Sequence, residues 1–399
     1  MKLKKLFGPS TLVAAAFIGP GTVTTCTIAG VTSGYTMLWS MLFSITATIV
    51  LQEMSARLGW ATGRGLGEAI RTQFDTGIGK YLSAFLVIAA ILIGNAAYEA
   101  GNLSGGILGL QLIVGESDLW PILVALLSFI LLYSGNYKFI ERLLVTLVII
   151  MSFSFLITAV IVKPNFTAVM QGFMPTKLDS SNILLFLGLL GTTVVPYNLF
   201  LHASTISKKY SQADKLSDIK LENYTSILLG GIISMLIIIT AAATAQNVTE
   251  VKSAADLATQ LEPVFGSSAK YLMGIGLMAA GCSSALTAPL AAAYAAKGLF
   301  GWQDGEKNWR FRMTWMTVLL LGTLVLLTGV KPIPVIKFAQ ITNAILLPFI
   351  AIFLIKISND KKLLGKFVNK SHQNILAILI IIVTIFLGLK TLNNFIEIF

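Results

Sequence analysis

The chain has 399 residues, of which 55% are apolar and 12% charged, and its formal net charge is +11. Ordinary soluble domains carry about 25% charged residues, so this composition predicts an integral membrane protein. Apolar stretches take up most of the length, which excludes a separate soluble domain of ordinary size. We therefore expect residues 1–399 to form a single transmembrane domain.

About eleven apolar stretches are each long enough to cross the roughly 30 Å of hydrocarbon in a bilayer, and they predict as many helices. In chain order they are residues 10–32, 36–58, 81–112, 119–136, 139–163, 182–207, 221–245, 268–298, 312–330, 334–357 and 373–396.

The basic residues predict the orientation of the chain and not a nucleic-acid partner. Most of the 29 Lys and Arg fall in alternate loops, on the side of the N-terminus. The positive-inside rule then predicts a cytoplasmic N-terminus, and an odd number of spans places the C-terminus outside. We expect a multi-pass protein of the bacterial plasma membrane, working as a monomer, with the lipid bilayer around it.

The residue types argue against catalysis. Cys26 and Cys282 both lie inside apolar spans, and His202 and His372 are the only histidines. The sequence contains no nucleophile beside a base and no phosphate-binding loop, so we expect neither an enzyme nor a bound cofactor.

Two spans carry a proline near the middle, beside small polar residues. The segments are Ile18-Gly19-Pro20-Gly21-Thr22 and Thr192-Thr193-Val194-Val195-Pro196-Tyr197-Asn198. Proline removes a backbone donor and clashes with the preceding turn, so each helix is expected to open there, and lipid cannot satisfy the freed groups. Half-helices should then begin near Gly21 and Tyr197, around a transported solute.

The broken spans are the first and the sixth. Transporters built from two inverted five-helix repeats hold their substrate between discontinuous helices at these positions. We therefore expect one repeat over residues 10–163, a second over 182–357, and an additional helix over 373–396.

Motifs spread along the chain carry a resemblance to a known family. They are Pro20-Gly21, Leu51-Gln52 and Ser55 to Gly59 in the first two spans, Gly191 to Ser204 in the sixth, Gly276 to Ser284 in the eighth, and Gln340 with Leu347-Pro348-Phe349 in the tenth. On these motifs the chain resembles the Nramp metal-ion transporters. The resemblance implies an all-α fold of eleven helices in the LeuT-like class, with helices 1 and 6 discontinuous.

The resemblance also implies where metal ligands would stand, and this chain departs from the pattern there. At the family's Asp, Asn, Met and His positions, in that order, it has Gly19, Thr22, Val195 and Tyr197. The acidic positions of the family's third helix hold Asn95 and Tyr98. Transition-metal ions need carboxylate, imidazole or sulfur ligands. We therefore do not expect this chain to transport a transition metal through these positions.

Glu99 is the one carboxylate that the sequence places well inside a span, because Glu53 lies near a helix end with Arg57 four residues on. An intramembrane acid is a candidate functional residue by default. The structural alternative is a glutamate that is bonded to the amides of Asn95 and Asn102 or that caps a neighbouring helix.

Half-helix N-termini carry partial positive charge and free N–H groups, which favour an anion where no carboxylate opposes them. We expect a small oxyanion such as bicarbonate as substrate. The candidate binding residues are Gly19, Gly21, Thr22, Asn95, Tyr98, Glu99, Thr192, Val195, Tyr197, Asn198 and Gln340. Na⁺ is the expected coupling ion, with hydroxyls of Ser283, Ser284 and Thr287 as candidate ligands.

Two alternatives stay open. A hydrated divalent cation such as Mg²⁺ keeps several waters and needs few carboxylates, and Glu99 offers one. A membrane sensor that kept the fold but lost transport would have a tightly packed, dry centre instead.

Overall fold

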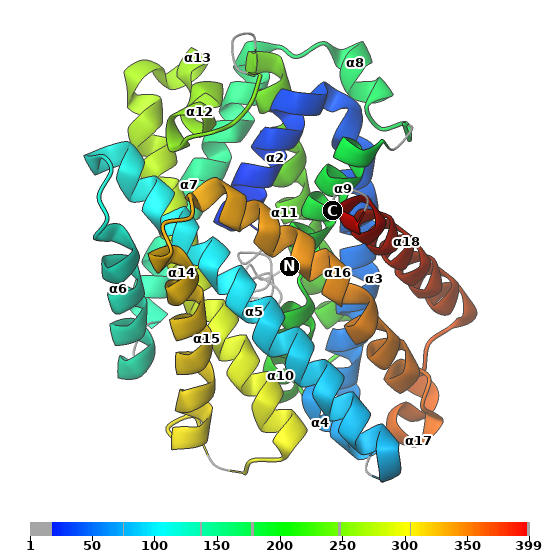
Figure 1. Cartoon of the computed structure of the whole chain (residues 1–399). Helices are drawn as coiled ribbons and strands as arrows, with labels where there is room; N and C mark the ends of the chain where they lie inside the picture. The colour runs from blue at the N-terminus through cyan, green and yellow to red at the C-terminus, as the bar shows by residue number, and fades with distance from the viewer. Residues whose placement is uncertain are drawn as a thin grey trace.

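The computed structural model describes residues 18–74, 76–135, 138–176, 179–245, 249–303 and 305–396. Every regular element in these ranges is helical, which confirms the all-α fold (Figure 1). The longer helices are α2 (Pro20–Ser33), α3 (Leu38–Thr62), α5 (Gly77–Val114), α6 (Trp120–Ser134), α7 (Lys138–Val162), α9 (Ser180–Thr193), α10 (Pro196–Lys209), α11 (Leu216–Thr244), α14 (Ala269–Phe300), α15 (Trp309–Leu327), α16 (Pro332–Ser358) and α18 (Ser371–Ile396).

Short helices and turns connect these elements. They are η2 (Gly34–Met37), α4 (Leu66–Gln73), α8 (Phe166–Gln171), α12 (Ala254–Ala258), η4 (Thr259–Leu261), α13 (Glu262–Phe265), η5 (Gly266–Ser268), α17 (Lys361–Leu364) and η6 (Gly365–Phe367). The end of the bundle that carries α8, α12 and α13 is called the upper end, and the end that carries α4 and α17 the lower end (Figure 1).

Among the described ranges, nine segments are long and apolar enough to span a membrane. One of them, Pro20–Thr62, joins two predicted spans through η2, and the predicted span 119–136 is the shorter helix Trp120–Ser134. Each predicted span therefore has a helical counterpart. The start of the first one, residues 10–17, lies outside the described residues, and the count of eleven stays a prediction.

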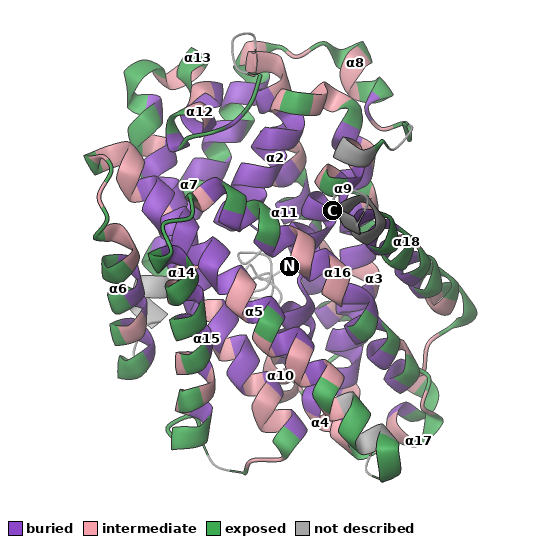
Figure 2. Cartoon of the chain, viewed as in Figure 1, coloured by how far each residue is buried: buried purple, intermediate pink, exposed green. Residues whose placement is uncertain are grey.

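Burial separates an inner group of helices from an outer one. α2 is buried from Pro20 to Gly30, whereas α6, α15 and α18 each expose one face (Figure 2). The exposed faces carry large apolar side chains such as Leu126, Leu320 and Phe386. A soluble protein would bury these side chains, so such faces fit contact with lipid.

Glycines let the inner helices approach closely. A Cβ on Gly59 of α3 would lie 2.4 Å from the carbonyl oxygen of Ala203 in α10. A Cβ on Gly109 of α5 would lie equally close, 2.4 Å, to the carbonyl of Gly274 in α14. Small residues at crossings of this kind are typical of helix packing in membranes, where dispersion contacts replace the hydrophobic effect.

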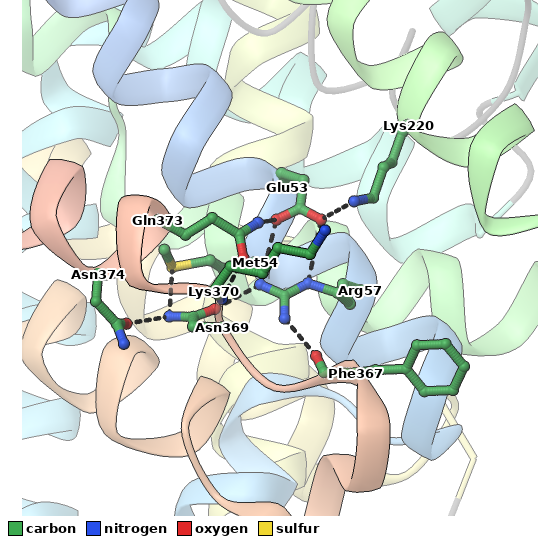
Figure 3. Close-up of polar contacts among 9 residues, drawn as sticks. All are labelled: Glu53, Met54, Arg57, Lys220, Phe367, Asn369, Lys370, Gln373 and Asn374. Carbon is green, nitrogen blue, oxygen red and sulfur yellow. Dashed lines mark hydrogen bonds and ion pairs between the residues drawn. The ribbon is translucent and has the colours of Figure 1, made fainter.

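A buried polar cluster at the lower end joins α18 to α3 (Figure 3). Glu53 and Arg57 form the predicted i,i+4 ion pair, with Nε and Oε1 3.1 Å apart and each side chain only 4% exposed. Lys220 of α11 lies 2.9 Å from the same carboxylate, and Gln373 of α18 donates to it at 3.0 Å. Arg57 also donates to the Phe367 carbonyl in the connection before α18. The helix outside the predicted repeats is thus bonded to the inner bundle.

Replacing Glu53 with Gln should destabilise the protein strongly. The variant keeps the shape of the side chain but leaves Arg57 and Lys220 without their shared counter-charge, and breaking a buried pair costs about 3–5 kcal/mol. The thermal unfolding midpoint of the detergent-purified protein measures the effect. Lys252→Gln is the matched control, because its pair with Glu250 is 73% and 65% exposed and should contribute little. Equal midpoints for Glu53→Gln and wild type would contradict this account of the cluster.

Candidate functional site

The first break lies at the start of α2. Gly19 has extended backbone angles, φ −82° and ψ 175°, and no side chain caps the helix. The helix begins at Pro20, one residue before the predicted start at Gly21, because proline lacks the N–H that a first-turn residue cannot bond and its φ suits the first position. The half of the span that precedes Ile18 lies outside the described residues.

The second break divides the sixth span, as predicted. α9 ends at Thr193, Val194 and Val195 are non-helical, and α10 begins at Pro196. This start is one residue before Tyr197, near which it was predicted, again because proline takes the first helical position. Backbone groups of the last turn of α9 and the first turn of α10 therefore end near the middle of the bundle.

One hydrogen bond connects the two breaks. The hydroxyls of Thr22 and Thr192 are 2.8 Å apart, and both residues are almost fully buried. Thr22 lies in the first turn of α2, and Thr192 in the last turn of α9. These two predicted site residues are thus brought together, although they are far apart in the sequence.

α16 covers both breaks. A Cβ on Gly21 would lie 2.2 Å from Nε2 of Gln340, and one on Gly191 would lie 1.8 Å from the Gln340 carbonyl oxygen. Asn343, one turn further along α16, donates to the Gly191 carbonyl at 3.4 Å. Asn343 was not predicted as a site residue from the sequence, although its helical spacing from Gln340 places both amides on one face of α16.

Aromatic and amide groups line the α10 side of the breaks. The rings of Tyr98 from α5 and Tyr197 from α10 meet edge to face with centroids 5.3 Å apart. Val195 packs in the same small cluster. Asn198 is fully buried, and neither atom of its amide has a hydrogen-bond partner within the described part of the chain. A buried amide without partners costs free energy, so this one is suited to bind a polar solute.

Two other predicted site residues of α5 face different neighbours. Asn95 donates to the Ala288 carbonyl in α14 at 3.2 Å, so it does not bond Glu99 as the structural alternative supposed. Glu99 accepts from Asn102 at 3.3 Å and lies against Gly322 of α15, where a Cβ would be 2.9 Å from its Cγ. The Cβ and Cγ atoms of Glu99 therefore pack against α15, whereas the ring of Tyr98 packs against Tyr197 of α10.

The predicted coupling-ion residues lie in the middle of α14. The hydroxyl of Thr287 donates to the carbonyl of Ser283 at 3.0 Å, four residues earlier in the same helix. Hydroxyls in membrane helices commonly make this bond. In the described part of the chain, the hydroxyls of Ser283, Ser284 and Thr287 make no hydrogen bond to α2.

α3 holds α10 in place below the break. Oε1 of Gln52 lies 2.7 Å from Nδ1 of His202, and the Ser55 hydroxyl donates to the Leu199 carbonyl. Together with the close approach of Gly59 to Ala203, these contacts fix the half-helix that carries Asn198. A movement of α10 must carry α3 with it or break these bonds.

The polar groups at the breaks are hydroxyls, amides and helix termini. In the ranges that the structure describes, no three His, Cys, Asp or Glu residues lie together as a metal site would need. The free groups beside the Thr22–Thr192 bond are hydrogen-bond donors and neutral acceptors.

Comparison with known proteins identifies the family. The model of the family described as natural resistance-associated macrophage protein-like matches residues 10–394. The chain belongs to the Nramp family. Members of this family are membrane transporters and not enzymes, so the protein is a multi-pass membrane transporter.

Curated Nramp relatives match over almost their whole length. A protein of Nostoc sp. named divalent metal cation transporter MntH is 30% identical over 407 residues, covering 96% of this chain and 89% of that protein. A protein of the same name from Pectobacterium carotovorum is 27% identical, with 97% and 93% covered.

Solved structures show the same fold. The manganese transporter of Eremococcus coleocola superimposes with a TM-score of 0.79 at 19% identity, over 96% of this chain and 85% of that one. MhsT in complex with L-phenylalanine gives a TM-score of 0.60 at 14% identity, over 96% and 97%. The expected LeuT-like class is therefore confirmed.

Replacing Gly191 with Ala should disrupt the contact between α9 and α16. The new Cβ would lie 1.8 Å from a backbone oxygen that cannot rotate away, and overpacking of this severity costs about 3 kcal/mol or more. The thermal midpoint and the yield of monodisperse protein measure the loss. Gly305→Ala is the control, since nothing lies within 4 Å of its Cβ position. Wild-type stability in Gly191→Ala would show that the breaks are not packed against α16 as described.

Proposed function

We propose that this Nramp-family transporter moves a small inorganic anion, with bicarbonate as the leading candidate. The single observation that carries the proposal is the set of groups at the two breaks. They are the paired hydroxyls of Thr22 and Thr192, the amide of Asn198, which has no hydrogen-bond partner among the described residues, and the N-termini of α2 and α10.

Helix termini decide the sign of the local potential. α2 and α10 both begin at a proline with no side-chain cap, and the dipoles place partial positive charge at the breaks. The N–H groups of Thr22 and Asn198 bond the carbonyls of Gly19 and Val195, which leaves those of Gly21 and Tyr197 available among the described residues. Such ends are ready-made anion sites. A bare divalent cation would need carboxylates there to outweigh this field.

The names of the curated relatives point to divalent metals, and this chain differs from the family where the metal should bind. Gly19, Thr22 and Val195 stand at the positions to which the resemblance assigns ligands, and none offers a charged oxygen, imidazole or sulfur. A transition-metal ion loses its waters only when such ligands replace them. We therefore propose that transition-metal selectivity has been lost.

One observation favours a second candidate, a hydrated Mg²⁺-like cation. Glu99 is fully buried, and its Oε1 has no hydrogen-bond partner among the described residues. An intramembrane carboxylate of this kind is expensive unless a proton or a cation accompanies it. Mg²⁺ keeps several waters, through which Glu99 could act at a distance.

Uptake of an anion needs a driving force, because the membrane potential opposes it by about 2.3 kcal/mol per 100 mV. We propose Na⁺ as the coupling ion, with Ser283 and Ser284 as its candidate ligands. The fold class supports this proposal, because unwound helices often coordinate Na⁺ in it. Residues 10–163 and 182–357 are proposed as the inverted repeats, because their first helices both contain a proline break.

The distribution of basic residues supports an orientation with the N-terminus in the cytoplasm, which places the upper end outside. The relatives are bacterial proteins, which favours the bacterial plasma membrane.

Uptake by reconstituted protein tests the proposal. Proteoliposomes should accumulate labelled bicarbonate, and an inside-negative potential without a Na⁺ gradient should slow the uptake, because the moving charge is negative. Asn198→Ala should reduce the rate by about tenfold, corresponding to the loss of roughly 1.4 kcal/mol of hydrogen bonding to the solute. Glu99→Gln should leave bicarbonate selectivity intact.

Different outcomes separate the candidates. Mg²⁺ uptake that is accelerated by an inside-negative potential and abolished in Glu99→Gln would replace the anion by the divalent cation. Mn²⁺ uptake with micromolar affinity would contradict both candidates, and thermal stabilisation by none of these ions would favour the sensor.

A further inference from the structure

A cavity at the upper end leads toward the two breaks. It has a volume of about 480 Å³ and lies between α2, η2, α9 and α16. Thr25 and Gly188 line it, and they are one helical turn above Thr22 and Thr192 respectively. The wall of the cavity therefore comes within about one helical turn of the hydrogen bond that joins the breaks.

Two residues of opposite charge, Asp179 and Lys337, line this cavity, and only Asp179 has a hydrogen-bond partner among the described residues. Asp179 caps α9 by accepting from the backbone N–H of Asn182 at 2.8 Å, so its negative charge faces the positive end of that helix. Lys337 of α16 is exposed and takes part in none of the ion pairs of the described residues. The ammonium of Lys337 thus has no ion-pair partner among the described residues.

Thr25 provides a second, independent observation. It is 4% exposed, and its hydroxyl has no hydrogen-bond partner within the described ranges. A hydroxyl in a membrane helix usually bonds the carbonyl four residues earlier, and for Thr25 that carbonyl belongs to Gly21 at the break. An unpaired buried hydroxyl in the wall of a cavity can donate to a bound solute.

We infer that this cavity is an outer binding site for a small oxyanion, formed by Lys337 and Thr25, which the solute occupies before it reaches the breaks. The inference rests on the proposed anion transport and extends it, since it assigns charge selection at the entrance to Lys337. The ammonium attracts an anion and repels a divalent cation at the same place. A lysine on the outer half of a span is also unusual in a chain whose basic residues are concentrated on the other side.

Kinetics of bicarbonate uptake by proteoliposomes holding the full chain test this site. Lys337→Gln should raise the KM about tenfold at low ionic strength while kcat changes little, because the charge acts on capture of the solute. Lys337→Arg should restore most of the affinity, and high salt should shrink the difference between variant and wild type. Thr25→Val should also raise the KM.

Lys331→Gln is the matched control, because Lys331 lies on the same end of α16 but lines a different cavity. It should leave the KM unchanged. An unaltered KM in Lys337→Gln, or an equal rise in Lys331→Gln, would overturn the outer site while bicarbonate transport stands. A wild-type protein that moves no oxyanion would overturn the outer site together with the proposed function.

Discussion

The hydrogen bond between Thr22 and Thr192 is the contact on which the architecture of the centre depends. It joins two helices that have each lost their own backbone bonds at a proline, in a place where neither lipid nor bulk water can replace them. The surrounding contacts hold the same helix ends together. Gln340 of α16 packs against Gly21 and Gly191, and Asn343 donates to the Gly191 carbonyl of α9. Gln52 and Ser55 of α3 hold α10.

This construction determines which chemistry the centre can support. Helix termini that end in a buried place bring partial charges with them, and the first turns of α2 and α10 contain no acidic residue and no side-chain cap. In a metal transporter the same scaffold would need charged or sulfur ligands to bind its ion. This chain has the scaffold of the Nramp family, and the hydroxyls and amides at its breaks are neutral hydrogen-bonding groups, which is why the solute that we propose is an anion.

The sequence predicted the two breaks because proline acts locally, through its own ring and its missing N–H. It could not predict that Glu99 turns toward α15 while Tyr98 turns toward α10, because helical spacing orders the faces of α5 without naming the helix that packs on each. The burial of the Glu53–Arg57 pair could not be predicted from the sequence for a related reason. Its partners Lys220 and Gln373 come from distant helices that meet only in the folded bundle (Figure 3). The cavity beside Lys337 likewise depends on how three helices diverge.

Equilibrium dialysis of the purified wild-type protein against labelled bicarbonate and, separately, against labelled Mn²⁺ tests most directly whether the breaks form an anion site. The account predicts saturable, stoichiometric binding of bicarbonate that is weakened in Asn198→Ala, and no saturable binding of Mn²⁺. Saturable Mn²⁺ binding that is lost in Asn198→Ala, with no bound bicarbonate, would contradict it.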